Sequence, residues 1–155
     1  MPRRHWLMKS EPSTYGIHHL ERDGTTSWEG VRNYQARNHM KEMKVRDGVI
    51  FYHSSAAPPG CAGVARVCRE AHPDLTAQKT GSKYHDPKAT KEKPIWEMVD
   101  IAFVEAFSDV VPLAELKETP GLEEMLVLRR GMRLSVQPMT KAEFDLIVKL
   151  GRRRS

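Results

Sequence analysis

The sequence has little cysteine and no long apolar run, and each absence excludes a class of protein. Two cysteines, Cys61 and Cys68, provide neither a disulfide framework nor the CxxC spacing of a zinc site. The apolar runs are only a few residues long, far short of the ~20 that cross a bilayer. Lys9 and Glu11 interrupt the N-terminal segment, which excludes a signal peptide. We therefore expect no membrane association and an intracellular location, cytoplasmic, or nuclear in a eukaryote.

The sequence also lacks the motifs of metal, nucleophile and phosphate-loop sites. His18 and His19 are adjacent, so they cannot both face one site on a helix, and no HExxH pattern occurs. Ser54 is not part of a GxSxG elbow. The segment from Gly60 to Gly63 has no P-loop lysine. These absences predict no metal site, no cofactor and no catalytic residue.

The 155 residues carry a net charge of +5, and the excess lies at the two ends. Such a length fits one domain, which we expect over residues 5–150, between a flexible basic N-terminus, 1–4, and a flexible basic tail, 151–155. The arginines of the two ends account for the whole excess, so residues 5–150 are neutral overall. Two interpretations of the ends remain open: solvated tails, or arms that bind phosphate.

Short strands and helices alternate in the expected secondary structure. Apolar and β-branched residues predict strands at 5–9, 49–53, 63–68 and 95–107, and apolar spacing with capping residues predicts helices at 13–23, 33–43 and 140–150, with helical turns at 113–117 and 122–125. The polar segment 72–94 is long for a loop in a compact chain, which is typical of a functional or mobile segment. The pattern predicts an α+β fold, a small, mostly antiparallel β-barrel with flanking helices.

Polar and aromatic residues gather where these strands meet loops. They lie in five segments, Lys9-Ser10-Glu11-Pro12, Trp28 to Asn38, Tyr52-His53-Ser54-Ser55, Pro94-Ile95-Trp96 and Arg133 to Pro138. Each has an ordinary explanation by itself, since Trp28 or Trp96 alone suits a core aromatic and Asn33 a helix cap. Together, and in this order, the segments resemble the EVE domain family over nearly the whole chain, from Trp6 through Val148. The arginine-rich C-terminus lies outside the resemblance.

The resemblance implies a PUA-like β-barrel, related to PUA, YTH and ASCH domains, with a pocket that admits one modified nucleobase of DNA or RNA. An indole could stack on such a base for about 1–3 kcal/mol, and small hydroxyls could bind its polar edge. We expect the pocket residues to be Ser10, Trp28, Val31, Asn33, Tyr34, Tyr52, Ser54, Trp96, Leu134 and Ser135. For Tyr34 and Tyr52, a place in the core is an equal alternative.

Phosphate contacts are expected from the cationic residues nearest these segments, Lys9, Arg32, Arg37 and Arg133. For the arginines the alternative is an ion pair with segment 97–124, which holds eight acidic residues and one lysine.

Three functions remain open at this point. The first is a non-catalytic module that binds DNA or RNA carrying a modified base, with any effector protein acting in trans. The second is an ASCH-like amidohydrolase that acts on modified nucleosides, in which Lys9 and Glu11 tune each other's proton affinity. The third is a protein-interaction adaptor that uses the acidic 97–124 surface.

Overall fold

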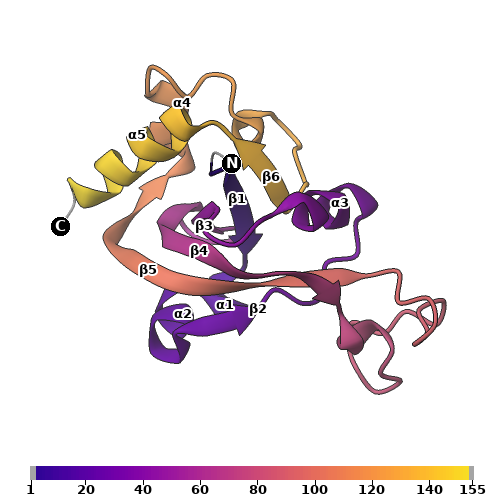
Figure 1. Ribbon diagram of the computed structural model, residues 1–155. Helices are drawn as coiled ribbons and strands as arrows, with labels where there is room; N and C mark the ends of the chain where they lie inside the picture. The colour runs from indigo at the N-terminus through magenta and orange to yellow at the C-terminus, as the bar shows by residue number, and fades with distance from the viewer. Residues whose placement is uncertain (1–2, 154–155) are drawn as a thin grey trace.

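Six strands form one curved sheet in the computed structural model, which describes residues 3–153 (Figure 1). The expectations for residues 1–2 and 154–155 lie outside this range. The sheet order is β2-β5-β4-β3-β1-β6, and the strands are β1 (His5–Ser10), β2 (Thr25–Ser27), β3 (Gly48–His53), β4 (Gly60–Pro73), β5 (Glu97–Pro112) and β6 (Val136–Met139). All neighbours are antiparallel except β1 and β3, which are parallel. The α+β class is therefore confirmed.

The sheet is open within the described range. Its edge strands, β2 and β6, each pair with one neighbour only, β5 and β1 respectively, and not with each other. The closed barrel expected from the sequence is therefore not confirmed. The long β5 nevertheless bends around the other strands, as Figure 1 shows, so the sheet is strongly curved.

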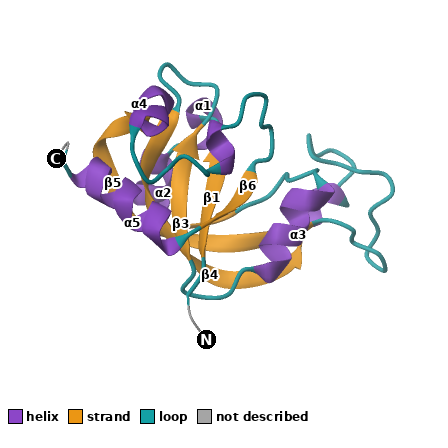
Figure 2. Cartoon of the chain, turned by 90° about the horizontal axis from the view of Figure 1, so that it is seen from above, coloured by secondary structure: helices purple, strands orange, loops and turns teal. Residues whose placement is uncertain are grey.

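Helices cover the sheet from two sides. They are α1 (Pro12–Tyr15), α2 (Ile17–Asp23), α3 (Tyr34–Glu42), α4 (Leu113–Glu118) and α5 (Lys141–Arg152), with 3₁₀ turns at Leu75–Ala77 and Leu126–Leu128. α5 packs on β4 and β5, whereas α3 contacts β4, β5 and β6. Figure 2 shows α4 and α5 on one side of the strands and α3 on the other.

Several element bounds differ from the sequence expectation for identifiable reasons. Gly16 is extended, with φ −102° and ψ 176°, so the expected helix at 13–23 is split into α1 and α2. Ile95 has φ +63°, a left-handed conformation, so β5 begins only at Glu97. The strand expected to end at Cys68 continues to Pro73, because β5 pairs with it over that length. The short edge strands β2 and β6 were not predicted, and no helix forms at 122–125, where the chain makes a turn.

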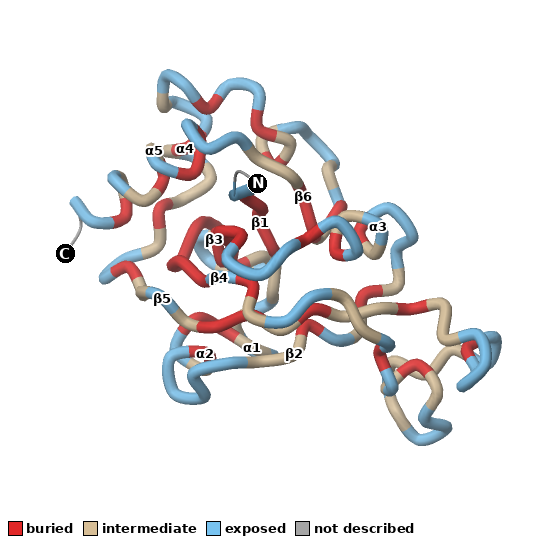
Figure 3. Tube along the Cα trace, viewed as in Figure 1, coloured by how far each residue is buried: buried red, intermediate tan, exposed pale blue. Residues whose placement is uncertain are grey.

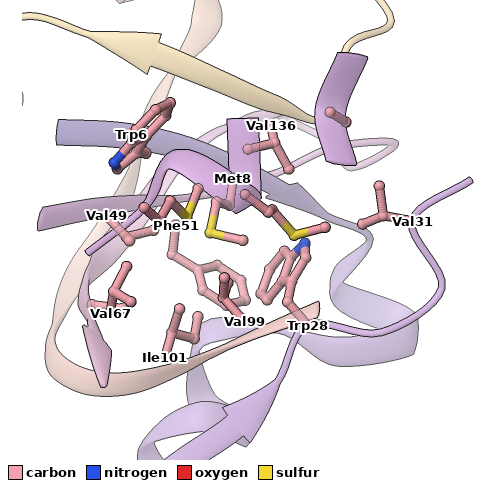
Figure 4. Packing of buried hydrophobic residues seen from close by; sticks show 14 of the residues in the cluster. Trp6, Met8, Trp28, Val31, Val49, Phe51, Val67, Val99, Ile101 and Val136 are labelled. Carbon is pink, nitrogen blue, oxygen red and sulfur yellow. The ribbon is translucent and has the colours of Figure 1, made fainter. Parts of the chain in front are cut away.

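Alternation along the central strands produces one apolar cluster on each face of the sheet. On β1, Trp6 and Met8 join the first cluster and Leu7 joins the second. On β3, Phe51 joins the first and Tyr52 the second. The buried stretches in Figure 3 follow these strands through the middle of the molecule, and Figure 4 shows the first cluster, which contains Trp28.

The closing helix follows its sequence signals closely. Thr140 accepts a hydrogen bond from the backbone N–H of Glu143, and the Glu143 carboxylate accepts one from the backbone N–H of Thr140, which together form the expected capping box. The helix runs to Arg152, so Gly151 and Arg152, expected in the flexible tail, belong to α5. Phe107 lies so close to Gly151 that a Cβ there would fall 2.4 Å from its ring, which is why a glycine is required.

Candidate functional site

A pocket of about 900 Å³ opens at the carboxyl ends of β1 and β3. Its volume is within the range of small-molecule sites. Eight residues that the sequence analysis assigned to base or phosphate contacts line it: Lys9, Ser10, Trp28, Val31, Arg32, Ser54, Arg133 and Ser135. The structure thus brings together residues from four of the five sequence segments.

The parallel pairing of β1 and β3 creates this meeting point. Parallel neighbours end at the same edge of a sheet, and Ser10 is the register partner of His53. The backbone N–H of Ser54 donates to the Ser10 carbonyl oxygen at 3.0 Å, and the N–H of Lys9 donates to the Ser135 carbonyl oxygen at 2.8 Å. Three separate segments are therefore fixed side by side at the pocket by backbone hydrogen bonds.

Trp28 supplies the apolar wall. Its indole packs edge-on against Phe51, with ring centroids 5.4 Å apart, and Figure 4 shows it between Phe51 and Val31. Trp6 and Trp96 each donate their indole N–H to a carboxylate, at 2.9 and 2.7 Å. The Trp28 Nε1 has no acceptor among the described residues, and it is not one of the buried unpaired atoms, so solvent reaches it. Trp28 is 8% exposed and belongs to the first apolar cluster, so it lines the pocket with a small part of its surface and can offer its N–H to a ligand.

The serines that line the pocket supply small polar groups. Ser10 donates its hydroxyl to the Tyr15 carbonyl oxygen at 2.6 Å, which leaves lone pairs of Oγ able to accept. The hydroxyls of Ser54 and Ser135 have no hydrogen-bond partner in the part of the chain that the structure describes. Each can donate one bond and accept others, as the edge of a nucleobase requires.

Gly30 and Tyr84 close one side of the pocket. Gly30 has φ +84°, and a Cβ on it would lie 2.6 Å from the Tyr84 ring. Both facts require glycine, since other residues rarely adopt this backbone conformation and any side chain would displace the tyrosine. The 74–94 segment, which projects from the sheet in Figure 1, is thereby packed directly against the pocket wall.

Arg32 holds the same segment in place. Its five N–H groups make five hydrogen bonds: two to the Tyr84 carbonyl oxygen and one each to Val31, Asp74 and Thr76. The Asp74 side chain is fully buried and also accepts from the backbone N–H of Gly30 at 2.8 Å. Arg32, expected at a phosphate, therefore has no N–H left for one. It lines the pocket as a structural clamp.

Asp74 is kept ionised by this clamp. Burial acts to raise its pKa, but hydrogen bonds from Thr76, Gly30 and Arg32 act in the opposite direction and together lower it. The buried carboxylate and the guanidinium thus stabilise each other.

Three other cations line the pocket, and two of them are unpaired. Lys9 donates from Nζ to the Met132 carbonyl oxygen at 3.1 Å, and burial lowers its pKa. Arg133 and Lys83 are exposed and make no ion pair within the described chain. Glu11 and Glu29 are the only acidic residues on this lining. The pocket mouth is therefore cationic on balance, which favours an anionic ligand.

Three residues expected in the pocket lie instead in the protein interior or at a helix end. Asn33 caps α3, and its side chain accepts from the backbone N–H of Ala36 at 2.9 Å. Leu134 is buried in the first apolar cluster. Tyr52 points to the opposite face of β3 from Phe51 and is 3% exposed, and burial raises its pKa to about 12.

Trp96, Tyr34 and Arg37 form a separate cluster beside the pocket. Trp96 packs on Ala77 and Ala89 inside the projecting segment, and the Tyr34 ring stacks on it at 4.8 Å. Arg37 donates to the Ile95 carbonyl oxygen at 2.9 Å and lies 4.9 Å from the Tyr34 ring. None of the three lines the pocket, because the segment folds over its own small core. The alternative of an ion pair with segment 97–124 is not realised for Arg37 either.

Several lining residues were not singled out from the sequence. They are Thr14 and Tyr15 of α1, Thr26 and Ser27 of β2, Lys83, Tyr84 and Met132, while Gly30 and Ser55 lie in the five segments but were assigned no contact. The unusual length of the 72–94 loop was the one available signal for Lys83 and Tyr84, and the loop does contribute to the pocket. The other residues are common types in unremarkable contexts, and only the sheet order places them here.

Residues 3–153 contain no group of three or more His, Cys, Asp or Glu side chains placed to hold a metal ion. They also contain no helix with the length and apolar character of a membrane span.

Comparison with known proteins places this architecture in a family. Human thymocyte nuclear protein 1 is 40% identical over 94% of this chain and 73% of its own length. A crystal structure of human THYN1 protein in complex with DNA containing 5-methylcytosine has a TM-score of 0.88 and 40% identity, and the match covers 96% of this chain and 97% of that one. A hypothetical protein from Leishmania major reaches a TM-score of 0.94 at 45% identity, covering 98% and 96% of the two chains.

A more distant likeness concerns the fold alone. The YTH domain of a Zygosaccharomyces rouxii protein, solved in complex with N6-methyladenosine RNA, has a TM-score of 0.59 and 15% identity, and the match covers 99% of this chain and 89% of that domain. The EVE domain family itself matches residues 4–150, which confirms the resemblance seen in the sequence. The chain belongs to the EVE domain family.

Proposed function

We propose that this protein binds a modified nucleobase of DNA in the pocket at the ends of β1 and β3, without catalysis. The observation that carries the proposal is the combination in one cavity of an indole with a free N–H, two free serine hydroxyls and a cationic mouth. A base taken out of its stack needs a flat partner and polar groups at its edge, and its flanking phosphates need cations.

The human relative supports the choice of ligand. It is 40% identical over nearly the whole chain, and its structure contains 5-methylcytosine DNA. Transfer of that ligand to this chain is part of the proposal. The curved sheet would then act as the PUA-like scaffold, with the pocket at the strand ends where its segments converge.

The roles of single residues follow from their contacts. Trp28 would stack on the base, Ser54 and Ser135 would bind its polar edge, and Val31 would contact a methyl group. Arg133 and Lys83 would contact phosphates, because they are exposed and unpaired. Arg32 would keep Tyr84 in position without touching the nucleic acid.

Titration of two duplexes that differ in one methyl group tests the proposal. One duplex carries a single 5-methylcytosine and the other carries cytosine at that position, and fluorescence anisotropy reports both affinities. Burial of one methyl group is worth about 0.8 kcal/mol, so we expect about fourfold tighter binding of the methylated duplex. Equal affinities for the two duplexes would contradict the proposal.

A hydrolase acting on modified nucleosides has weaker support. It requires Lys9 and Glu11 to tune each other's proton affinity, but the Lys9 ammonium donates to the Met132 carbonyl oxygen and forms no ion pair with Glu11 in the described structure. Incubation with N-acetylated nucleosides checks this directly by chromatography. We expect no product above the uncatalysed rate, and turnover that a Lys9→Met variant loses would overturn the non-catalytic assignment.

A further inference from the structure

A second hollow lies on the other face of the sheet, between α5 and strands β4 and β5. Its volume is about 1000 Å³, and it shares no lining residue with the base pocket. On β4, Val64 and Arg66 face this groove, whereas Ala65 and Val67 point into the cluster that contains Trp28. The groove between α5 and β4–β5 is therefore separate from the pocket.

Six cationic side chains line this groove, and all are exposed. They come from four distant parts of the sequence: Arg3, Arg46, Arg66, and the group Lys149, Arg152 and Arg153 at the end of α5. Arg3, Arg152 and Arg153, three of the five arginines at the chain ends, are thus brought together with Arg46 and Arg66.

Most of this charge is not neutralised by the protein. The groove contains two acidic residues, and each has a partner already: Glu105 binds Arg152 at 2.8 Å, and Asp145 binds Lys141 at 2.7 Å. Within residues 3–153, none of the other five lining cations forms an ion pair. Like charges gathered in this way repel each other, and a bound polyanion would relieve the repulsion.

The floor of the groove is apolar. Val64, Phe144 and Val148 contribute to it, and Val104 is 46% exposed, which is unusual for a large aliphatic side chain in this molecule. A groove with an apolar floor and cationic rims complements a chain that alternates sugar rings with phosphates. Arg46, at one rim, has φ +84°, a conformation that favours glycine, and such strain is often found at functional positions.

We propose that this groove binds the phosphodiester backbone of nucleic acid, as a contact surface independent of base identity. The choice of nucleic acid over other polyanions rests on the proposed function of the pocket. Two such surfaces would let the protein hold unmodified DNA weakly through the groove and read a modified base through the pocket.

Salt dependence of binding to an unmodified duplex tests the groove by itself. The test variant is Arg66→Gln with Lys149→Gln, and the matched control is Lys41→Gln with Lys117→Gln, which removes the same charge from exposed sites outside both cavities. If each groove residue contacts one phosphate, the negative slope of log K against log salt becomes shallower by about 1.8 in the test variant, and affinity near 0.1 M salt falls roughly tenfold to a hundredfold. The control keeps the wild-type slope.

Other outcomes decide against the inference or separate it from the pocket. A test variant with the same salt slope and affinity as the control would overturn the groove assignment. A test variant that loses binding to anionic phospholipid vesicles but still binds the duplex like the wild type would also overturn it. The ratio of affinities for methylated and unmethylated duplexes should stay at the wild-type value, because the pocket is untouched. Absence of any such discrimination in the wild type would refute the pocket function and leave the salt result valid. Should the test variant fail to fold, Arg46→Gln with Arg153→Gln replaces it, with the same expectation.

Discussion

At the scale of single residues, internal hydrogen bonds decide which tryptophans and arginines remain available to bind a ligand. Trp6 and Trp96 donate their indole N–H groups to Asp47 and Asp86, whereas the N–H of Trp28 is free. Arginines differ in the same way, because every N–H of Arg32 is used internally while Arg133 is exposed and unpaired. Hydrogen bonds thus separate the residues of one type that are fully used inside the protein from those that are free for the proposed binding roles.

Gly30 is the residue whose substitution affects the pocket wall most directly. Gly30→Ala places a Cβ 2.6 Å from the Tyr84 ring at φ +84°, so we expect a loss of about 1–3 kcal/mol in the free energy of unfolding. Urea denaturation measures it. In a double-mutant cycle, Tyr84→Ala removes the steric part and should recover some of the loss. If the losses in unfolding free energy of Gly30→Ala and Tyr84→Ala simply add in the double variant, the Tyr84 ring is not what opposes a Cβ at position 30.

At the scale of elements, the buried Arg32–Asp74 ion pair is one of the contacts that attach the projecting 74–94 segment to the pocket. Asp74 accepts hydrogen bonds from Arg32, Gly30 and Thr76, and these join the segment to the loop after β2. This contact is polar and depends on ionisation, unlike the apolar packing of the central strands. It is therefore sensitive to pH.

Asp74→Asn should destabilise the protein in a pH-dependent way. The folded-state pKa of Asp74 lies below its ordinary value of 3.8, so its carboxylate stabilises the fold above that pH, and the stabilisation is lost as pH falls through the folded-state pKa. We expect a cost of about 3 kcal/mol at pH 7, as for other broken buried pairs, shrinking below pH 3.8. Chemical denaturation of both proteins across this range measures the difference. A difference that does not change with pH would exclude the ionised pair as its cause.

Gly151 provides a test with an unusual sign. Alanine is normally better than glycine inside a helix by up to about 1 kcal/mol. In α5, however, a Cβ at this position would lie 2.4 Å from the Phe107 ring, so we expect Gly151→Ala to lower stability by about 1–3 kcal/mol. Thermal unfolding reports the sign, and Gly81→Ala, where a Cβ meets no atom within 4 Å, is the matched control. A stabilised Gly151→Ala variant would contradict the packing.

Local rules explain which parts of these elements could be predicted from the sequence. The capping box at Thr140 and the apolar stripe of α5 are signals within a few residues of each other, and both are confirmed. The edge strands β2 and β6 depend on partners distant in sequence, and at the break between α1 and α2 the backbone N–H of Ile17 donates to His53 Nε2, 36 residues away. No local pattern encodes the two edge strands.

At the scale of the whole molecule, the parallel pairing of β1 and β3 is what assembles the pocket. It places Ser10 beside Ser54 and, through β6, brings Ser135 to the same edge. The sequence identified the segments that surround the pocket but not which side chains line it. Trp28 and Trp96 were therefore equal candidates for the pocket wall. Only the folding of the 74–94 segment around its own small core, with Trp96 inside, separates the two indoles.

The same architecture gives the two faces of the sheet different surfaces. One face carries the pocket beside Trp28, and the other carries the groove between α5 and β4–β5. A reader of modified bases with such an arrangement would owe its discrimination to the pocket and part of its affinity to the groove. The two contributions are separable, because they involve no common residue.

Whether the base enters beside Trp28 is tested most directly by comparing Trp28→Phe with Trp96→Phe. Both changes replace a nearly buried indole by a smaller aromatic ring, but only Trp28 lines the pocket. Anisotropy titrations with methylated and unmethylated duplexes give the affinity ratio for each variant. We expect Trp96→Phe to keep the wild-type preference for 5-methylcytosine and Trp28→Phe to lose it. A preserved preference in Trp28→Phe, or equal losses in both folded variants, would contradict base capture at this pocket.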